Sequence, residues 1–316
     1  MTAIVYSAYN AAPAGLADDA TAEDLWYSAL RSEPRIGGLE LPVIGGTLHP
    51  HGLDRMADLL DPEWSNTISA MSMTLGALTS SPHYGLASVD RGGRQLALAD
   101  IADAREATLR LQERLGPDSV RAFALQSAPR ADRSRLSAFT ESLAEIATWD
   151  WGNIELLVEH SDALIAGQTP QKGYLALEEE VAAVRSVAAS NAQRIRHLLN
   201  WGRSAIEGRN ATTPCDHIQI VGAGLGGFAF SGAGPLATKR SAEWEDAHLG
   251  LSADEPESLL SRDALHAVLT KLPDDLSYIG VKTGAAARSR GLERLQLGLS
   301  MLGALSQIGR RSALMG

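Results

Sequence analysis

Short apolar runs alternate with longer amphipathic stretches along the whole of this 316-residue chain. Eight of the runs are predicted to be β-strands, and they recur roughly thirty to fifty residues apart, the length of one strand plus the helix that follows it. Several are apolar on both faces, as parallel strands between a core and a helix layer are. The predicted strands are Ile4–Tyr9, Ile36–Leu41, Thr67–Met73, Val120–Gln126, Ile154–His160, Ile195–Trp201, Gly227–Ser231 and Leu276–Lys282.

The stretches between these runs have the spacing of helices. Leu136, Phe139, Leu143 and Ile146 fall three or four residues apart and so form one apolar stripe. Ser134 is the predicted N-cap of that helix, because its hydroxyl can accept a hydrogen bond from a backbone N–H of the first turn. The spacing therefore predicts a helix that packs one face against the strands.

The alternation of strands and helices predicts the fold class. Elements of these lengths that alternate along a chain favour an α/β fold with a parallel sheet. Eight such units in 316 residues favour a (β/α)8 TIM barrel over an open sheet. We expect one barrel domain over residues 1–316, with long functional loops at Ala11–Thr21 and Lys239–Pro256.

Composition narrows the class of partner. Acidic residues outnumber basic ones by 38 to 28, which gives a net charge of −10, whereas nucleic-acid binding needs clustered Lys and Arg. No apolar run reaches the ~18 residues that span a bilayer, and the N-terminus has no apolar leader. With one cysteine, Cys215, no disulfide can form within the chain. We expect a cytoplasmic protein that binds neither nucleic acid nor a membrane, and its oligomeric state stays open.

One glycine-rich motif competes with the barrel. Gly222, Gly224 and Gly227 follow the apolar run Ile218–Val221 with the G-x-G-x-x-G spacing typical of dinucleotide sites. A dinucleotide fold needs a long helix after the motif, but Pro235 and further glycines interrupt the chain within a few residues. We therefore interpret the motif as a helix end that leads into the seventh strand.

In a barrel of this kind, functional residues gather at the carboxyl ends of the strands. Glu40 lies in the second predicted strand, Glu159 near the end of the fifth, and Lys282 ends the eighth. Two carboxylates in different surroundings can divide the roles of acid and base, and an ammonium can polarise a carbonyl oxygen. His160 is a candidate proton carrier, which makes four predicted catalytic residues. Either carboxylate can instead be a structural ion pair, Glu159 with Lys282 or Arg203.

Further candidates for substrate binding lie near these strand ends. Amide and charged side chains can hold hydroxyls or an anionic group, and an indole can stack on the C–H face of a sugar ring. Each candidate can also be a core or solvated residue. The predicted substrate-binding residues are Tyr6, Asn10, Gln126, Asp162, Asn200, Trp201, Arg203, Glu207, Asp246 and His248.

Several phrases of the sequence resemble a known superfamily. The order of elements, with a Glu-His pair closing the fifth strand, resembles the xylose isomerase-like TIM barrel superfamily of sugar isomerases and epimerases. Six phrases are more specifically similar to an uncharacterised bacterial family within it, and together they span nearly the whole chain. They are Gly38–Pro42, Tyr84–Asp90, Trp149–Trp151, Val158–Ala163, Asn200–Glu207 and Phe230–Gly232. The resemblance implies a fold but no established activity.

The resemblance also implies a metal site from which this chain departs. Ketose epimerases of the superfamily hold one divalent metal with Glu, Asp, His and Glu at the ends of strands five to eight. Here Glu159 matches, whereas Asn200, Ser231 and Lys282 stand at the other three positions. A neutral amide, a hydroxyl and an ammonium cannot replace those ligands at a divalent cation. We therefore predict no metal ligand and no cofactor, with a divalent metal elsewhere as the alternative.

The favoured hypothesis is a carbohydrate-active enzyme similar to a sugar isomerase or epimerase, which moves a proton beside a carbonyl without the usual metal. One alternative is glycoside hydrolysis by paired carboxylates, in which a separation of about 5 Å indicates retention and about 6.5–9.5 Å inversion. Another is a non-catalytic sugar-binding barrel, favoured if Arg or Lys fully holds the Glu159 carboxylate. Nuclease activity is disfavoured because it needs several metal ligands and a basic groove.

Overall fold

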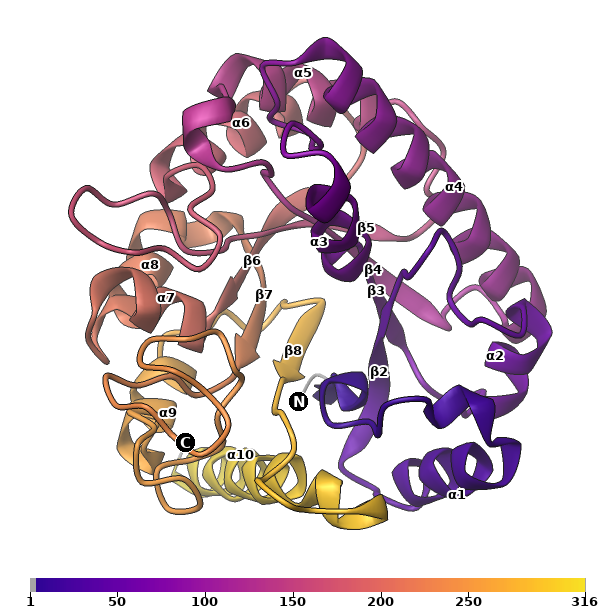
Figure 1. The fold of residues 1–316 in the computed structure, drawn as a ribbon, viewed down its shortest axis with the longest axis vertical. Helices are drawn as coiled ribbons and strands as arrows, with labels where there is room; N and C mark the ends of the chain where they lie inside the picture. The colour runs from indigo at the N-terminus through magenta and orange to yellow at the C-terminus, as the bar shows by residue number, and fades with distance from the viewer. Residues whose placement is uncertain (1–3, 316) are drawn as a thin grey trace.

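Eight parallel strands close into a barrel in the computed structural model, which describes residues 4–315 (Figure 1). The strands follow one another in chain order, and β1 pairs with β8 to complete the circle. They are β1 (Ile4–Tyr6), β2 (Ile36–Pro42), β3 (Asn66–Ser69), β4 (Val120–Leu125), β5 (Glu155–Glu159), β6 (Ile195–Asn200), β7 (Leu225–Phe230) and β8 (Tyr278–Val281). The predicted fold class is confirmed.

A ring of helices surrounds the barrel (Figure 1). Three of the four residues of the predicted apolar stripe, Phe139, Leu143 and Ile146, are 0% exposed, and the fourth, Leu136, is partly buried. The α-helices are α1 (Ala20–Arg31), α2 (Leu53–Leu59), α3 (Met71–Ser80), α4 (Arg91–Leu115), α5 (Leu136–Ala147), α6 (Leu177–Ala188), α7 (Trp201–Gly208), α8 (Thr213–Val221), α9 (Arg262–Leu269) and α10 (Gln296–Met315). Among the residues described, no helix is long and apolar enough to cross a membrane.

The structure corrects some local predictions. Strand β3 ends at Ser69, four residues early, because α3 has already begun at Met71. Ser134 does not cap α5, since its hydroxyl donates to the carbonyls of Pro129 and Arg130 and Arg135 takes the N-cap position. Local turn contacts outcompete the helix terminus for this hydroxyl.

The glycine motif is a helix end, as predicted. The apolar run before it is the second half of α8 rather than a strand. Gly222 ends that helix with a φ of 57°, a conformation that glycine adopts without steric cost. A single 3₁₀ turn, Gly222–Gly224, then leads into β7.

Alternation along the strands sends every second side chain into the barrel. The middle of the barrel holds a small apolar cluster, which consists of Val5, Ala122, Ala124, Leu157, Leu198, Ala229 and Tyr278. Two residues further along the chain, the same alternation turns inward the side chains of Ser7, Gln126, Glu159, Asn200 and Ser231. The polar layer above the apolar cluster is the mouth of the barrel.

Ion pairs occupy the opposite end of the barrel. Arg196 on β6 contacts Glu155 on β5 at 2.5 Å and Asp275 at 2.9 Å. Arg194, a more exposed residue, also contacts Glu155, at 3.2 Å. Charged residues therefore stand at both ends of the barrel, with the apolar cluster between them.

Candidate active site

The centre of the mouth is the ammonium group of Lys282, which follows β8. Its Nζ lies 2.8 Å from Oε1 of Glu40 and 2.6 Å from Oε1 of Glu159. The three residues are at most 2% exposed. Although burial alone would lower the pKa of Lys282, the charges of Glu159 and Glu40 raise it. The ammonium form is therefore held at neutral pH.

Hydroxyl groups surround the carboxylate of Glu40 on β2. Ser7 and Tyr278 donate to its Oε2 at 2.8 and 2.6 Å, and Tyr9 donates to its Oε1 at 3.1 Å. Burial and the nearby charge of Glu40 raise the pKa of both tyrosines well above the usual value. Both phenols therefore remain hydrogen-bond donors at neutral pH.

Two cations and one amide hold the carboxylate of Glu159 at the end of β5. Lys282 and Arg203 both contact Oε1, Arg203 at 2.7 Å, and Gln126 donates to Oε2 at 3.2 Å. Burial alone would raise the pKa of Glu159, but the charges of Arg203 and Lys282 lower it to about 2. Glu159 is therefore an anion held by two cations, the arrangement expected of the non-catalytic alternative.

Two long loops meet beside Arg203. Lys172, in the loop between β5 and α6, pairs with Asp246, in the loop between β7 and α9. Asp246 also contacts Arg203 Nε at 3.0 Å and Nδ1 of His248 at 3.3 Å. We call the three acids and three bases linked in this way the mouth cluster, which consists of Glu40, Glu159, Asp246, Lys172, Arg203 and Lys282. Their formal charges cancel.

The positive neighbours of Asp246 fix its charge. Burial would raise its pKa, but the charges of Lys172 and Arg203 lower it well below the usual value. Burial lowers the pKa of His248 to about 4, despite the partly opposing charge of Asp246. His248 is therefore a neutral imidazole at physiological pH.

Asn200 positions Arg203 instead of facing a ligand with its oxygen. Its Oδ1 accepts hydrogen bonds from the backbone N–H groups of Gly202 and Arg203, at 2.9 and 3.3 Å, and so caps α7. The same oxygen accepts from the Ser231 hydroxyl at 2.7 Å. The predicted binding residue therefore orients the helix that carries the guanidinium.

The four strand-end positions of the superfamily's metal site do not fit a divalent cation in this chain. Two positive groups, Lys282 and Arg203, lie within 2.7 Å of the Glu159 oxygen that would have to face the metal. The oxygens of Asn200 and Ser231 hydrogen bond to each other. A divalent cation placed here would be repelled by Lys282 and Arg203, and it would find only one carboxylate, that of Glu159, which both cations already contact. We therefore derive no step through a metal at the mouth.

Several predicted residues lie outside the mouth. Tyr6 faces outward, because a Cβ on Gly298 of α10 would collide with its hydroxyl. Trp201 is 0% exposed and packs in the core between barrel and helices, so it offers no open face to a sugar. Asn10 lies in a 3₁₀ turn after β1, and its buried Nδ2 has no partner among the described residues. Asp162 accepts backbone N–H groups of residues 171–173 and so shapes the Lys172 loop.

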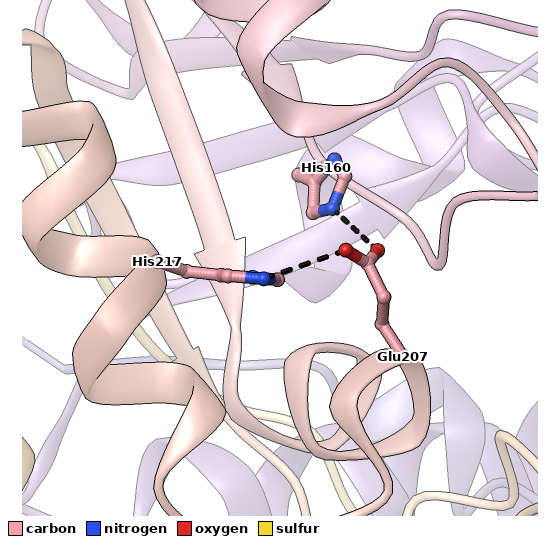
Figure 2. Close-up of side chains that lie close together, drawn as sticks. All are labelled: His160, Glu207 and His217. Carbon is pink, nitrogen blue, oxygen red and sulfur yellow. Dashed lines mark hydrogen bonds and ion pairs between the residues drawn. The ribbon is translucent and has the colours of Figure 1, made fainter. Parts of the chain in front are cut away.

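His160 and Glu207 form a second cluster with His217 on the outer side of the barrel wall (Figure 2). His160 follows Glu159 and therefore points the opposite way. Its Nε2 lies 3.0 Å from Oε2 of Glu207, and Nε2 of His217 lies 3.5 Å from Oε1 of the same carboxylate. Burial would lower the pKa of His160, but the charges of Glu180 and Glu207 raise it to about 10. The structure thus separates His160 from the catalytic group in which it was predicted.

Sequence reasoning missed several contacts of both clusters. Ser7 and Tyr278 could have been found, because each lies two residues from an inward-facing position. No pattern in the sequence indicates Lys172, because it reaches the mouth from a loop. No pattern indicates Glu180 or His217 either, because they lie on helices whose approach to His160 depends on the tertiary fold.

Comparisons with known proteins agree with the architecture. The model of the family described as Domain of unknown function (DUF4862) matches residues 5–297. A protein of Salmonella typhimurium (strain LT2), described as Uncharacterized protein STM3670, is 30% identical over 290 residues, which are 89% of this chain and 89% of that protein. The predicted resemblance to an uncharacterised family is thereby confirmed.

Solved structures share the barrel at low identity. A D-tagatose 3-epimerase-like protein aligns with a TM-score of 0.61 and 14% identity, over 90% of this chain and 94% of that one. A xylose isomerase domain containing protein from Salmonella typhimurium LT2 also has a TM-score of 0.61, at 10% identity, over 96% of this chain and 97% of that one. At these identities the likeness shows the fold alone, which is that of a xylose isomerase-like TIM barrel.

Proposed function

The chain belongs to the DUF4862 family, and we propose that it is an enzyme that isomerises or epimerises a sugar by proton transfer, without a metal ion in the barrel mouth. One observation carries the proposal, which is the buried ammonium of Lys282 between the carboxylates of Glu40 and Glu159. Buried charges are costly, and they cluster where chemistry needs them. The epimerase-like structural neighbour makes a sugar the first substrate class to test.

In the proposed reaction, the carbonyl oxygen of the sugar replaces a carboxylate oxygen on Lys282. Glu159, freed from part of its positive surroundings, becomes more basic and removes the proton from the carbon beside the carbonyl. Lys282 hydrogen bonds the developing oxyanion. In isomerisation, the proton returns to the former carbonyl carbon while the proton of the adjacent hydroxyl passes to the former carbonyl oxygen. In epimerisation, Glu40 is the second acid–base group and returns a proton to the same carbon from the opposite face. Gln126 and Arg203 are placed to bind hydroxyls beside Glu159.

Glycoside hydrolysis fits the mouth less well. Oxygens of Glu40 and Glu159 that contact one nitrogen at 2.8 and 2.6 Å lie at most about 5.4 Å apart, which suits a retaining but not an inverting enzyme. Hydrolysis also needs a protonated carboxyl group as the general acid. Glu159, whose pKa is about 2, does not supply one at neutral pH.

A sugar-binding protein without turnover is the second candidate. The observation that favours it is that Glu159 contacts two cations, Arg203 and Lys282, and also accepts a hydrogen bond from Gln126. A carboxylate held so firmly is a poor base unless a ligand displaces one of the donors. Binding without chemistry is therefore the outcome that separates the two candidates.

The test follows exchange of carbon-bound protons in D₂O. We expect the purified protein to replace the proton beside the carbonyl with deuterium in at least one member of a panel of aldoses and ketoses, seen by proton NMR. Glu159→Gln should slow the exchange by a factor of about 10² or more. Aryl glycosides belong in the panel, and their cleavage would favour hydrolysis. Saturable binding without exchange would favour the sugar-binding candidate.

A matched control comes from the same strand. Glu155→Gln removes the other buried carboxylate of β5, at the far end of the barrel. We expect it to lower stability but to keep the exchange rate per folded molecule. Wild-type exchange in Glu159→Gln would contradict the assignment of the base. His217→Gln removes a possible metal ligand from the second cluster, so that a chelator can act only on a metal elsewhere. If a chelator then abolished proton exchange in this variant, a metal in the mouth would be implicated and the metal-free reaction contradicted.

A further inference from the structure

Two histidines and one glutamate converge outside the barrel wall (Figure 2). His160 follows β5, Glu207 lies near the end of α7, and His217 lies in α8. One ligand atom from each lies within 4.8 Å of the others. We propose that this His–Glu–His cluster binds a Zn²⁺ ion, and the inference is independent of the proposed function because the cluster shares no residue with the mouth cluster.

Partners on the far side of each imidazole orient both rings. Nδ1 of His160 contacts Glu180 at 2.7 Å, and Nδ1 of His217 contacts the Ser204 hydroxyl at 3.0 Å. Both Nε2 atoms are therefore left to face Glu207. Histidines that bind zinc are held in this way, with the second ring nitrogen bonded to a carboxylate or another polar group.

The spacing of the ligand atoms suits tetrahedral zinc. With Zn–N bonds of 2.0–2.1 Å, neighbouring ligand atoms of a tetrahedral site lie roughly 3.3 Å apart. Nε2 of His160 lies 3.0 Å from Oε2 of Glu207, and Nε2 of His217 lies 3.5 Å from Oε1. Because one ligand atom of each residue lies within 4.8 Å of the other two, these atoms need to close in by no more than about 1.5 Å around an ion. Two imidazoles and a carboxylate are ligands that zinc takes readily, whereas calcium and magnesium prefer oxygen.

The carboxylate is both anchored and accessible. The backbone N–H of Ala163 donates to Oε2 of Glu207 at 2.7 Å. The Glu207 side chain is 12% exposed, against 1% for His160 and 6% for His217. An ion can therefore reach the cluster along the side of Glu207, and three protein ligands leave a fourth position for water.

The bound ion would join three elements of the wall. His160 follows β5, while α7 and α8 supply the other ligands. Helix α7 also carries Arg203, the cation that contacts Glu159. The competing explanation is a proton on His160 between Glu180 and Glu207, which would satisfy the same carboxylates without an ion.

Metal titration decides between an ion and a proton. Protein stripped with a chelator is titrated with Zn²⁺ by calorimetry and with Co²⁺ by visible absorption. We expect one equivalent to bind, tetrahedral Co²⁺ bands to appear, and Zn²⁺ to raise the melting temperature. His217→Gln should abolish all three effects. Ser204→Ala keeps every ligand and should weaken binding by about 10–100-fold, which provides a test if His217→Gln does not fold.

The control is another buried histidine paired with a carboxylate. His49 contacts Glu23 at 2.8 Å in a separate part of the wall, and His49→Gln should bind Zn²⁺ like the wild type. Absence of saturable binding to the wild type would overturn the proposal in favour of the protonated pair. Wild-type affinity in both His217→Gln and Ser204→Ala would overturn it as well, because the ion would then sit elsewhere.

Discussion

Most buried polar side chains of the barrel have hydrogen-bond partners, but the imidazole of His197 on β6 has none within the described part of the chain. Both of its ring nitrogens are buried without a hydrogen-bond partner among the described residues. Burial lowers its pKa to about 3, and the nearby positive charges of His160 and Arg185 act in the same direction. The ring is therefore neutral when folded, whereas an unfolded chain would protonate it below about pH 6.5.

We expect His197→Leu to remove part of the acid sensitivity of the protein. Because the folded pKa lies below the unfolded one, His197 costs stability progressively as the pH falls from about 6.5 towards 3. The leucine variant should unfold less readily over that window and gain about 1–2 kcal/mol at pH 7, since an unsatisfied polar group leaves the core. The free energy of unfolding, measured with denaturant at a series of pH values, gives both the acid sensitivity and the gain at pH 7. The exposed His266→Leu is the control, and equal acid slopes in all three proteins would contradict the prediction.

At the scale of elements, two loops depend on each other. The loop between β5 and α6 supplies Lys172 and Gln171, and the loop between β7 and α9 supplies Asp246, whose side chain pairs with Lys172 and whose backbone N–H donates to Gln171. Asp162 holds the first loop through backbone N–H groups. Because the mouth cluster is largely buried and includes the ion pair between these loops, we expect a ligand to enter where the two loops part.

Lys172→Met tests the contact between the loops. We expect faster amide hydrogen exchange in both loops and an unchanged barrel, because Asp246 loses its partner on the opposite loop but keeps Arg203. Lys239→Met, at an exposed position of the second loop, should leave the exchange unchanged. Protection that stays the same in both loops of Lys172→Met would show that the ion pair does not hold them together.

The sequence predicts elements better than it predicts the contacts between them. All eight strands were predictable from their regular spacing along the chain, and several also because a buried parallel strand is apolar on both faces. Glu40, Glu159 and Lys282 were predictable as strand-end groups, and their convergence follows from closure of the barrel. The structure places His160 apart from Glu40, Glu159 and Lys282, because consecutive strand residues face opposite sides and its partners Glu180 and His217 come from helices. Its role in catalysis stays a prediction.

The whole molecule separates two kinds of ion pair along the barrel. Glu155, Arg196 and Asp275 pair at one end, where the ligand-facing loops do not reach, and the mouth cluster lies at the other. In the first network Glu155 and Arg196 are buried but Asp275 is exposed. The mouth cluster links six largely buried charged groups from three strands, one helix and two loops. We therefore expect the first network to serve stability and the second to serve binding or catalysis.

Arg196→Met should lower the free energy of unfolding by on the order of 3 kcal/mol, because it leaves Glu155 buried with only the more exposed Arg194 beside it. Proton exchange on a substrate sugar should persist in the folded fraction. Arg194→Met, whose side chain is 57% exposed, should cost no more than about 1 kcal/mol. Denaturant unfolding gives both values, and equal losses would contradict the distinction between the two arginines.

The phenol of Tyr278 determines whether a ligand can pass through the barrel. It fills the space above Gly280, reaches Glu40, and stands on the apolar cluster that plugs the cylinder. A small molecule therefore cannot leave through the far end of the barrel, and it must enter and leave at the mouth. We expect any ligand to enter and leave between the same two loops, so a substitution that loosens them should speed both binding and release.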